Sequence, residues 1–130
     1  MASRNTELLD EVAKKCKTLG AEGVLVLKCD VSKEEDCKSL VRSSVEKFGG
    51  IDILVLNAGV TMNSFVEDVV DRSIYKTLMD TNYFGCINPT LEALPEIIKA
   101  KGTIAVGWFR FSLFLVPIVS FFFYYICKCS

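Results

Sequence analysis

The chain has 130 residues, which is enough for one domain of ordinary size. Its formal net charge is −1, so it has no basic field that would bind nucleic acid, and no nucleic-acid partner is expected. It has no histidine, which removes the most common general base and metal ligand.

The six cysteines do not suggest a metal site. Cys16, Cys29, Cys37 and Cys86 occur singly within helix or strand patterns, where a free cysteine behaves as a small hydrophobic residue. The other two form a C-x-C pair near the end of the chain, whereas a closed structural site usually needs four ligands. We therefore predict no metal and reduced thiols. The first residues contain no apolar run, so no signal peptide is predicted.

The first predicted elements are a helix over residues 5–19 and a strand that begins at Val24. Apolar residues recur at helical spacing over 5–19, and Gly20 ends the pattern. The strand is a continuous run of Val and Leu over residues 24–27 that ends in Cys29 and Asp30. Such a run indicates a strand buried on both faces, as in a parallel sheet.

A second helix is predicted to open at Ser32. The order Ser32-Lys33-Glu34-Glu35 matches a capping box, in which the serine side chain bonds the helix N-terminus. Gly49 and Gly50 end this helix. The residues expected to form its buried stripe are Cys37, Leu40, Val41, Val45 and Phe48.

The strand-and-helix pattern then repeats. A second buried strand is predicted over residues 51–56, followed by a helical stretch from about Asp71 to Lys99 with a bend at Pro89. A third strand is predicted to begin with residues 103–106. Strands that alternate with helices through short connections indicate an α/β fold with right-handed crossovers and a parallel sheet.

Candidate ligand-binding residues follow the strands. In doubly wound sheets the ligand lies beyond the carboxyl ends of the strands, where Asp30 and Val31 follow one strand here. Asn57-Ala58-Gly59 follows the next, and small residues let a cofactor approach the backbone closely. Taken singly, the first group could be a helix cap and the second a simple turn.

In this order the motifs resemble the short-chain dehydrogenase/reductase family. They are "CDVS" at 29–32, "IDILVLNAGV" at 51–60, "MDTNYFG" at 79–85 and "ALPEIIKAKGTIAV" at 93–106. "DVSKEEDCKSLV" and "NPTLEALP" are similar to the 11-beta-hydroxysteroid dehydrogenase-like branch. The resemblance implies a Rossmann-type domain over residues 1–106 and NAD(P)-dependent oxidoreduction of alcohols or carbonyls on lipophilic, steroid-like substrates.

The resemblance also implies roles for individual residues. Arg4 would hold the 2′-phosphate of NADP, as suits a guanidinium group. Asp30 and Val31 would contact the adenine ring. Three residues would line the side of the nicotinamide ribose: Asn57, Ala58 and Gly59.

Asn82 matches the helix asparagine that, in this family, supports a proton-relay water beside the catalytic lysine. The alternative is that Asn82 is only a polar residue at a helix kink near Pro89. Because the other catalytic residues of the pattern are not found here, Asn82 is expected to be vestigial as a catalytic residue.

The sequence departs from the family pattern at both ends, so it resembles a truncated member. It contains no G-x-x-x-G-x-G turn for the pyrophosphate. In the family the strand at 103–106 should run into the catalytic serine, but here it runs into Gly107-Trp108-Phe109-Arg110. Tyr124 and Lys128 have the spacing of the family's catalytic pair, but they follow that strand too closely and lie in an apolar run. We therefore predict doubtful NADP binding and no dehydrogenase activity.

The predicted fold is a partial doubly wound parallel sheet that lacks its first strand. In the order 3-2-1-4-5-6 that strand is central, so the strands at 24–29 and 51–56 would lie on opposite sides of its position. Either these two strands close up against each other or another segment fills the position. Unpaired central edges are aggregation hazards.

Residues 107–130 form a hydrophobic tail. Residues 111–127 carry no charge, and a membrane-spanning helix needs about 20 apolar residues, with a lower limit near 17. Lys99, Lys101 and Arg110 precede this segment, which favours a single span with the globular part in the cytosol, on a membrane such as the endoplasmic reticulum. A changed reading frame or a retained intron would also give such a sequence, and the location would then be cytoplasmic.

Three hypotheses follow from the sequence. The first is a truncated dehydrogenase fragment without catalysis. The second is a non-enzymatic protein, tethered to membrane lipid by its tail, that forms a homo- or heterodimer through the helix carrying Asn82. The third is an incomplete gene model of an active enzyme.

Overall fold

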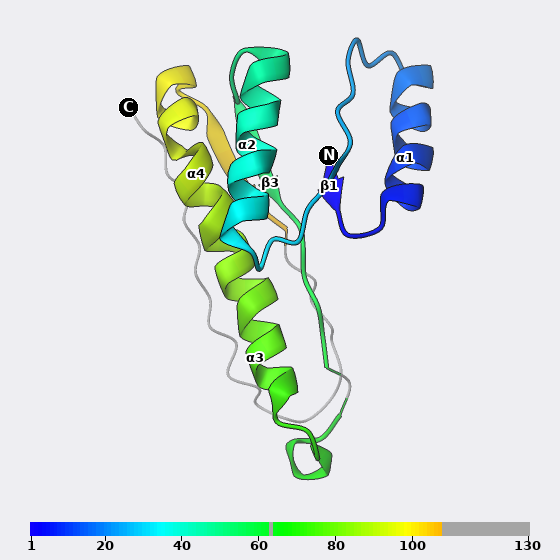
Figure 1. Cartoon of the computed structure of the whole chain (residues 1–130), viewed down its shortest axis with the longest axis vertical. Helices are drawn as coiled ribbons and strands as arrows, with labels where there is room; N and C mark the ends of the chain where they lie inside the picture. Colours follow the sequence, from blue (N-terminus) through cyan, green and yellow to red (C-terminus); the bar gives the residue numbers. More distant parts are fainter. Residues whose placement is uncertain (63, 108–130) are drawn as a thin grey trace.

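The computed structural model describes residues 1–62 and 64–107 (Figure 1). Two short helical turns accompany the main elements: a 3-10 turn, η1 (Val66–Asp68), and a π turn, η2 (Asp80–Phe84). The main elements, in chain order, are β1 (Ala2–Ser3), α1 (Thr6–Thr18), β2 (Leu27–Lys28), α2 (Glu34–Phe48), β3 (Ile53–Leu56), α3 (Ser73–Met79), α4 (Gly85–Ala100) and β4 (Thr103–Val106).

The four strands form two separate parallel pairs. Ala2 of β1 lies opposite Leu27 of β2, and Ile53 of β3 lies opposite Thr103 of β4. Within the described residues neither β1 nor β2 pairs with β3. The predicted α/β class with parallel strands is therefore confirmed. The two predicted flanking strands do not close up against each other.

Strand β3 is buried on one face only, so the prediction that both its faces are buried is wrong. Leu56 is 7% exposed, whereas Ile53 is 66% and Val55 is 63% exposed. Successive side chains of a strand point to opposite faces, and α4 packs against the face of β3 that carries Leu56. Within the described residues the face with Ile53 and Val55 is left open to solvent.

The first two helices lie close to their predicted positions, but one cap differs. The Asn5 side chain accepts a hydrogen bond from the Leu8 N–H (3.1 Å), which fixes the start of α1. The predicted capping box at Ser32 is wrong, because α2 begins after Lys33 and has no side-chain cap. Gly49 ends α2 with a φ of 84°, a left-handed conformation that glycine adopts without strain.

The predicted long helix is divided at a position different from the expected one. Helices α3 and α4 are joined by the π turn Asp80–Phe84, whereas Pro89 lies buried within α4. Proline lacks the N–H that would bond the carbonyl of Gly85, and its ring crowds that carbonyl. Pro89 therefore disturbs the helix at Gly85, and the π turn ends one residue earlier, at Phe84.

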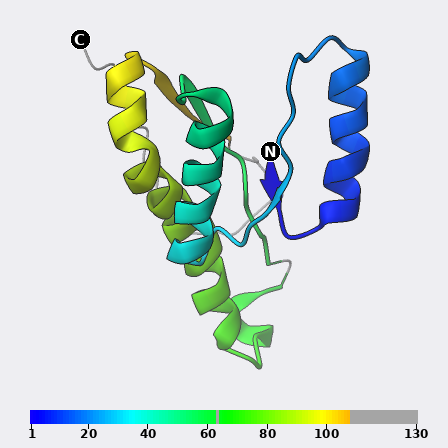
Figure 2. The same cartoon turned by 45° about the horizontal axis from the view of Figure 1, so that its top comes forward.

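The small core lies mainly among α2, α4 and the strand ends, while α1 stands apart from α2 and α4 in both views (Figures 1 and 2). Phe48 was expected in the core but is 51% exposed, with its ring against Gly23. The buried hydrophobic residues are Ala13, Cys29, Cys37, Leu56, Ala93 and Ile97.

The predicted membrane helix at about 111–127 lies outside the described residues, as does the rest of the tail after Gly107. In the part of the chain that the structure describes, every helix is too short or too polar to cross a membrane.

Candidate functional site

The helical segment α3–α4 contacts the ends of two strands from different sheets. The Asn88 side chain of α4 donates a hydrogen bond to the Val31 carbonyl, just after β2 (3.2 Å). The Asn82 side chain of the π turn bonds the backbone of Val60, just after β3. The carboxyl ends of β2 and β3 therefore lie along the same side of the molecule, as expected for ligand-binding loops of a doubly wound sheet.

Asn82 holds the loop after β3 through both atoms of its amide. Its Oδ1 accepts a hydrogen bond from the Val60 N–H (2.8 Å), and its Nδ2 donates one to the Val60 carbonyl (2.9 Å). A Cβ atom added to Gly59 would lie 3.5 Å from Asn82 Oδ1. Asn82 thus positions the backbone of the predicted Asn57-Ala58-Gly59 segment, and its catalytic role stays a prediction.

Asp30 is held as a carboxylate at the end of β2. Its Oδ1 accepts hydrogen bonds from the N–H (3.2 Å) and hydroxyl (2.8 Å) of Ser32. These bonds are the main cause of the lowered pKa of Asp30, and the charges of Arg4 and Lys33 lower this pKa further. The Asp30 N–H donates to the Asp36 carboxylate (2.8 Å), so the side chain and the backbone of Asp30 are both fixed.

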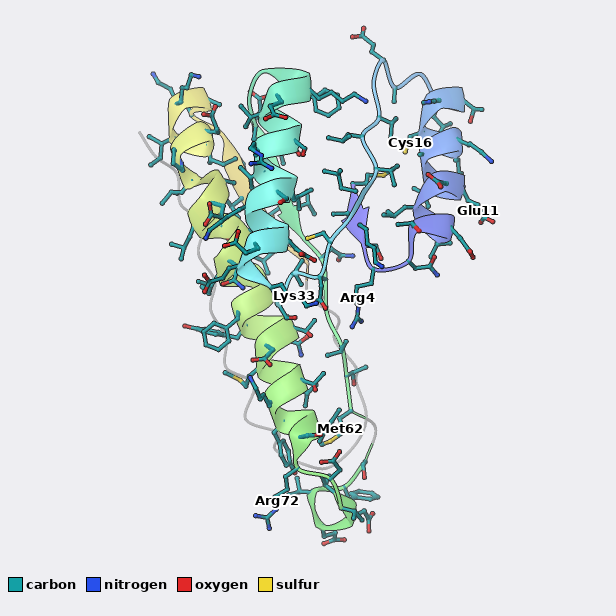
Figure 3. The ribbon with its side chains drawn as sticks, viewed as in Figure 1. Arg4, Glu11, Cys16, Lys33, Met62 and Arg72 are labelled. Atoms are coloured by element: carbon teal, nitrogen blue, oxygen red, sulfur yellow. The ribbon has the colours of Figure 1, made fainter. Side chains whose placement is uncertain are left out.

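Arg4 and Asp30 line one cavity of about 530 Å³ beside the carboxyl ends of β1 and β2. The other lining residues are Lys28, Lys33 and Asp36. Figure 3 shows Arg4 and Lys33 close to each other at this end of β1. Sequence reasoning missed the two lysines, although each lies within three positions of Asp30. The cavity gathers three cationic and two anionic groups.

Val31 packs closely against α2 and α4. Its carbonyl also accepts a weak hydrogen bond from the Cys37 thiol (3.5 Å). Burial raises the pKa of Cys37 to about 12, so the thiol keeps its proton at neutral pH. A Cβ atom on Gly85 would lie 2.6 Å from a methyl carbon of Val31. Sequence reasoning missed Gly85, although a glycine inside a helical pattern is a signal of close packing.

Asn57, Ala58 and Gly59 are exposed at the end of β3. The Gly107 N–H donates a hydrogen bond to the Leu56 carbonyl (2.7 Å), which extends the pairing of β3 and β4 into this loop. A side chain on Gly107 would clash with Asn57 Oδ1. The segment therefore presents its backbone to solvent beside the end of β4.

The predicted site residues form two groups. Arg4, Asp30 and Val31 lie at the β1–β2 end, and the segment 57–59 with Asn82 lies at the β3 end. Helix α4 contacts the first group, at Val31, through Asn88 and Gly85, and the π turn directly before α4 contacts the loop of the second group through Asn82. Among the described residues, no three or more Cys, Asp or Glu side chains are grouped to hold a metal ion.

Comparison with known proteins identifies the family. The model of the short chain dehydrogenase family matches residues 1–106. The chain belongs to this family. Its sequence lies in the branch of 11-beta-hydroxysteroid dehydrogenase-like members, as predicted.

Two plant relatives illustrate the similarity to this branch. An 11-beta-hydroxysteroid dehydrogenase of Pinus massoniana is 37% identical over 113 residues, covering 83% of this chain and 32% of the relative. 11-beta-hydroxysteroid dehydrogenase A of Sesamum indicum is 37% identical over 122 residues, covering 94% of this chain and 35% of the relative. The chain thus spans about a third of the length of these curated relatives.

Solved structures of the family share the fold. An alcohol dehydrogenase from the archaeon Thermococcus sibiricus, complexed with 5-hydroxy-NADP, has a TM-score of 0.75 at 22% identity, covering 81% of this chain and 44% of that one. The enoyl-[acyl-carrier-protein] reductase (NADH) from Aquifex aeolicus VF5 has a TM-score of 0.69 at 30% identity, covering 81% of this chain and 46% of that one. The Rossmann-type assignment is therefore confirmed.

Proposed function

We propose that this chain carries the adenosine side of an NADP site from an oxidoreductase that acts on alcohol or carbonyl groups of lipophilic, steroid-like substrates. The cavity at the carboxyl ends of β1 and β2 is the observation that carries the proposal. The names of the plant relatives support the substrate class, and the archaeal structure, complexed with 5-hydroxy-NADP, supports a phosphorylated cofactor.

The charges of the cavity fit an adenosine 2′-phosphate. Arg4 offers a planar guanidinium group, which binds phosphate oxygens in a bidentate manner, and Lys33 adds a second cation. The Oδ1 atom of Asp30 accepts both hydrogen bonds from Ser32, so this oxygen faces Ser32 rather than the phosphate, and the carboxylate keeps its charge. With Lys28 included, the cavity has one more positive than negative group, which favours NADP over NAD.

The cofactor, when bound, supplies or accepts the hydride of the family reaction. In this chain Arg4 and Lys33 would hold the phosphate. Asn82 would keep the segment 57–59 in place beside the ribose. In the sequence, β4 is followed by Gly107-Trp108-Phe109-Arg110 where the family pattern runs into its catalytic serine, and we therefore propose that the chain alone does not transfer hydride. NADPH oxidation by the pure chain with any ketone would contradict this part of the proposal.

Arg4→Ala removes the guanidinium group from the cavity and should weaken binding of 2′,5′-ADP by about tenfold or more, because it deletes a bidentate phosphate contact. Binding of 5′-AMP should change little. Isothermal titration of the chain with both nucleotides measures the two affinities. The matched control is Arg42→Ala on α2, which removes the same charge from an exposed arginine outside the cavity. Equal losses for both nucleotides, or for both variants, would refute the assignment of Arg4.

We also propose that the chain dimerises, with a second copy or an intact relative, through the helical segment carrying Asn82. Apolar side chains at helical spacing remain exposed along it: Phe84 (46%), Ile87 (37%), Leu91 (63%) and Ile98 (51%). An exposed apolar stripe of this kind is typical of a helix-packing interface.

Leu91→Glu should abolish this association, because it places a charge at the most exposed position of the stripe. Light scattering coupled to size-exclusion chromatography reports the molar mass of the parent and of the variant. Lys99→Gln, at an exposed position of the same helix, changes the net charge by the same single unit and is the control. A monomeric parent chain would rule out the homodimer, and a dimeric Leu91→Glu variant would rule out this interface.

A further inference from the structure

Asn88 lies at a position of α4 where the local sequence disfavours a helix. It comes directly before Pro89, and proline disfavours a helical conformation in the residue that precedes it. Asparagine also has a low helix propensity, because its side chain competes for nearby backbone groups. Here the half-buried side chain instead donates, through Nδ2, to the carbonyl of Val31, 57 positions earlier (3.2 Å). A residue that local preference opposes is expected to serve such a tertiary contact.

The carbonyl that Asn88 binds lies in the turn between β2 and α2. This turn closes through a hydrogen bond from the Lys33 N–H to the Asp30 carbonyl (2.9 Å). Helix α2 has no side-chain cap, so its first turn gives this segment no capping bond. The Val31 carbonyl accepts hydrogen bonds from two side chains, the Cys37 thiol (3.5 Å) and the Asn88 amide (3.2 Å). A thiol is a weak donor, so Asn88 makes the stronger of these two contacts.

The same turn carries two residues of the cavity at the end of β2. Asp30 and Lys33 line this cavity and lie on either side of Val31 in the chain. The Asp36 carboxylate fixes the turn to α2, because it accepts a hydrogen bond from the Asp30 N–H (2.8 Å). Asn88 fixes the turn to α4, a helix that contributes no residue to the cavity lining. Asn88 therefore acts on a ligand in the cavity only through the position of the turn.

We propose that Asn88 is a positioning residue for nucleotide binding, an inference that rests on the proposed NADP function. Its amide holds the Val31 carbonyl against α4 and thereby places Asp30 and Lys33 for the adenosine 2′-phosphate side of the nucleotide. The π turn directly before α4 holds the loop after β3 through Asn82. Two asparagine amides on one helical segment thus fix both groups of site residues.

Asn88→Leu tests this role, because leucine has almost the size of asparagine but cannot donate to Val31. Binding of 2′,5′-ADP to the full 130-residue chain, measured by isothermal titration, should weaken by about tenfold. Asn88→Gln keeps the amide and should recover most of the affinity. The matched control is Thr90→Val, which removes a part-buried hydrogen bond of the same helix, from Thr90 to the Cys86 carbonyl (2.7 Å). This variant should bind 2′,5′-ADP like the parent chain.

Amide hydrogen exchange of the nucleotide-free chain measures the same contact without a ligand. The amides of Asp30, Ser32 and Lys33 make the hydrogen bonds of the turn, so they should exchange about tenfold faster in Asn88→Leu. Their exchange should be unchanged in Thr90→Val. Equal exchange at these three amides in the parent chain and in Asn88→Leu would overturn the proposal.

The titrations separate the role of Asn88 from the nucleotide site itself. A parent chain that does not bind 2′,5′-ADP would refute the proposed site and this role with it. A parent chain that binds, with equal affinities for Asn88→Leu and Thr90→Val or with no recovery in Asn88→Gln, would refute the role of Asn88 alone. If Asn88→Leu does not fold, Asn88→Ala, which adds no bulk, takes its place with the same expected loss.

Discussion

Gly102→Ala should lower the free energy of unfolding by more than about 3 kcal/mol. A Cβ atom at this position would overlap the carbonyl of Asp52, which accepts the hydrogen bond from Thr103 at the start of the β3–β4 pair. Because the obstacle is backbone and not a flexible side chain, the clash is relieved only by separating the strands. Circular dichroism melts should show the melting temperature falling by about 10 °C or more.

Gly50→Ala is the matched control for this prediction. Gly50 lies near the same end of β3, its φ is not positive, and an added Cβ would lie 3.7 Å from Glu96 Oε2, an ordinary contact. The free energy of unfolding should change by less than about 0.5 kcal/mol. If Gly102→Ala proved as mild as Gly50→Ala, the close approach of residue 102 to Asp52 would be wrong.

Gly85→Ala should cost about 2 kcal/mol of folding free energy, despite the higher helix propensity of alanine. The added Cβ would lie 2.6 Å from Val31 Cγ2 and 3.3 Å from Val31 Cβ. Valine has a stiff side chain, so either α4 or the segment after β2 must shift. Urea denaturation of parent and variant measures the loss.

A double variant tests the cause of that loss. Val31→Ala removes the methyl groups that meet the new Cβ, so Val31→Ala combined with Gly85→Ala should recover about 1 kcal/mol or more relative to the sum of the single changes. Strict additivity would mean that Gly85 is required for another reason, such as the geometry of the π turn before it. The cycle also tests the contact by which α4 holds the predicted adenine-side residue in place.

Sequence patterns located the elements better than they predicted their burial. The strand at 103–106 and the helix at 5–19 follow from local signals, namely a β-branched run and an apolar period closed by Gly20. The burial of β3 depends on what covers its second face, and no local pattern contains that information. The strand predicted to begin at Val24 is limited to Leu27–Lys28 in the structure, because its partner β1 has only two residues to pair with it.

The sequence predicted site residues whose role follows from their position directly after a strand. It did not predict the hydrogen bonds that side chains make with one another or with a distant part of the backbone. Asp30 and the segment 57–59 were found because they follow strands. The capping box failed because the Ser32 hydroxyl donates to Asp30, a competition that the motif itself does not reveal. The bond of Asn82 to Val60 joins residues 22 positions apart, so it could only be seen in three dimensions.

The π turn at Asp80–Phe84 has a consequence for how homologous sequences should be aligned. A π turn accommodates one residue more than an α-helical turn would, and each residue of an α-helix advances by about 100°. The side chains of α3 are therefore set out of rotational phase with those of α4 by about one residue. A relative lacking one residue in this turn would keep a continuous helix, yet its asparagine would face away from the loop after β3. Conservation of length across residues 80–84 thus matters as much as conservation of Asn82 itself.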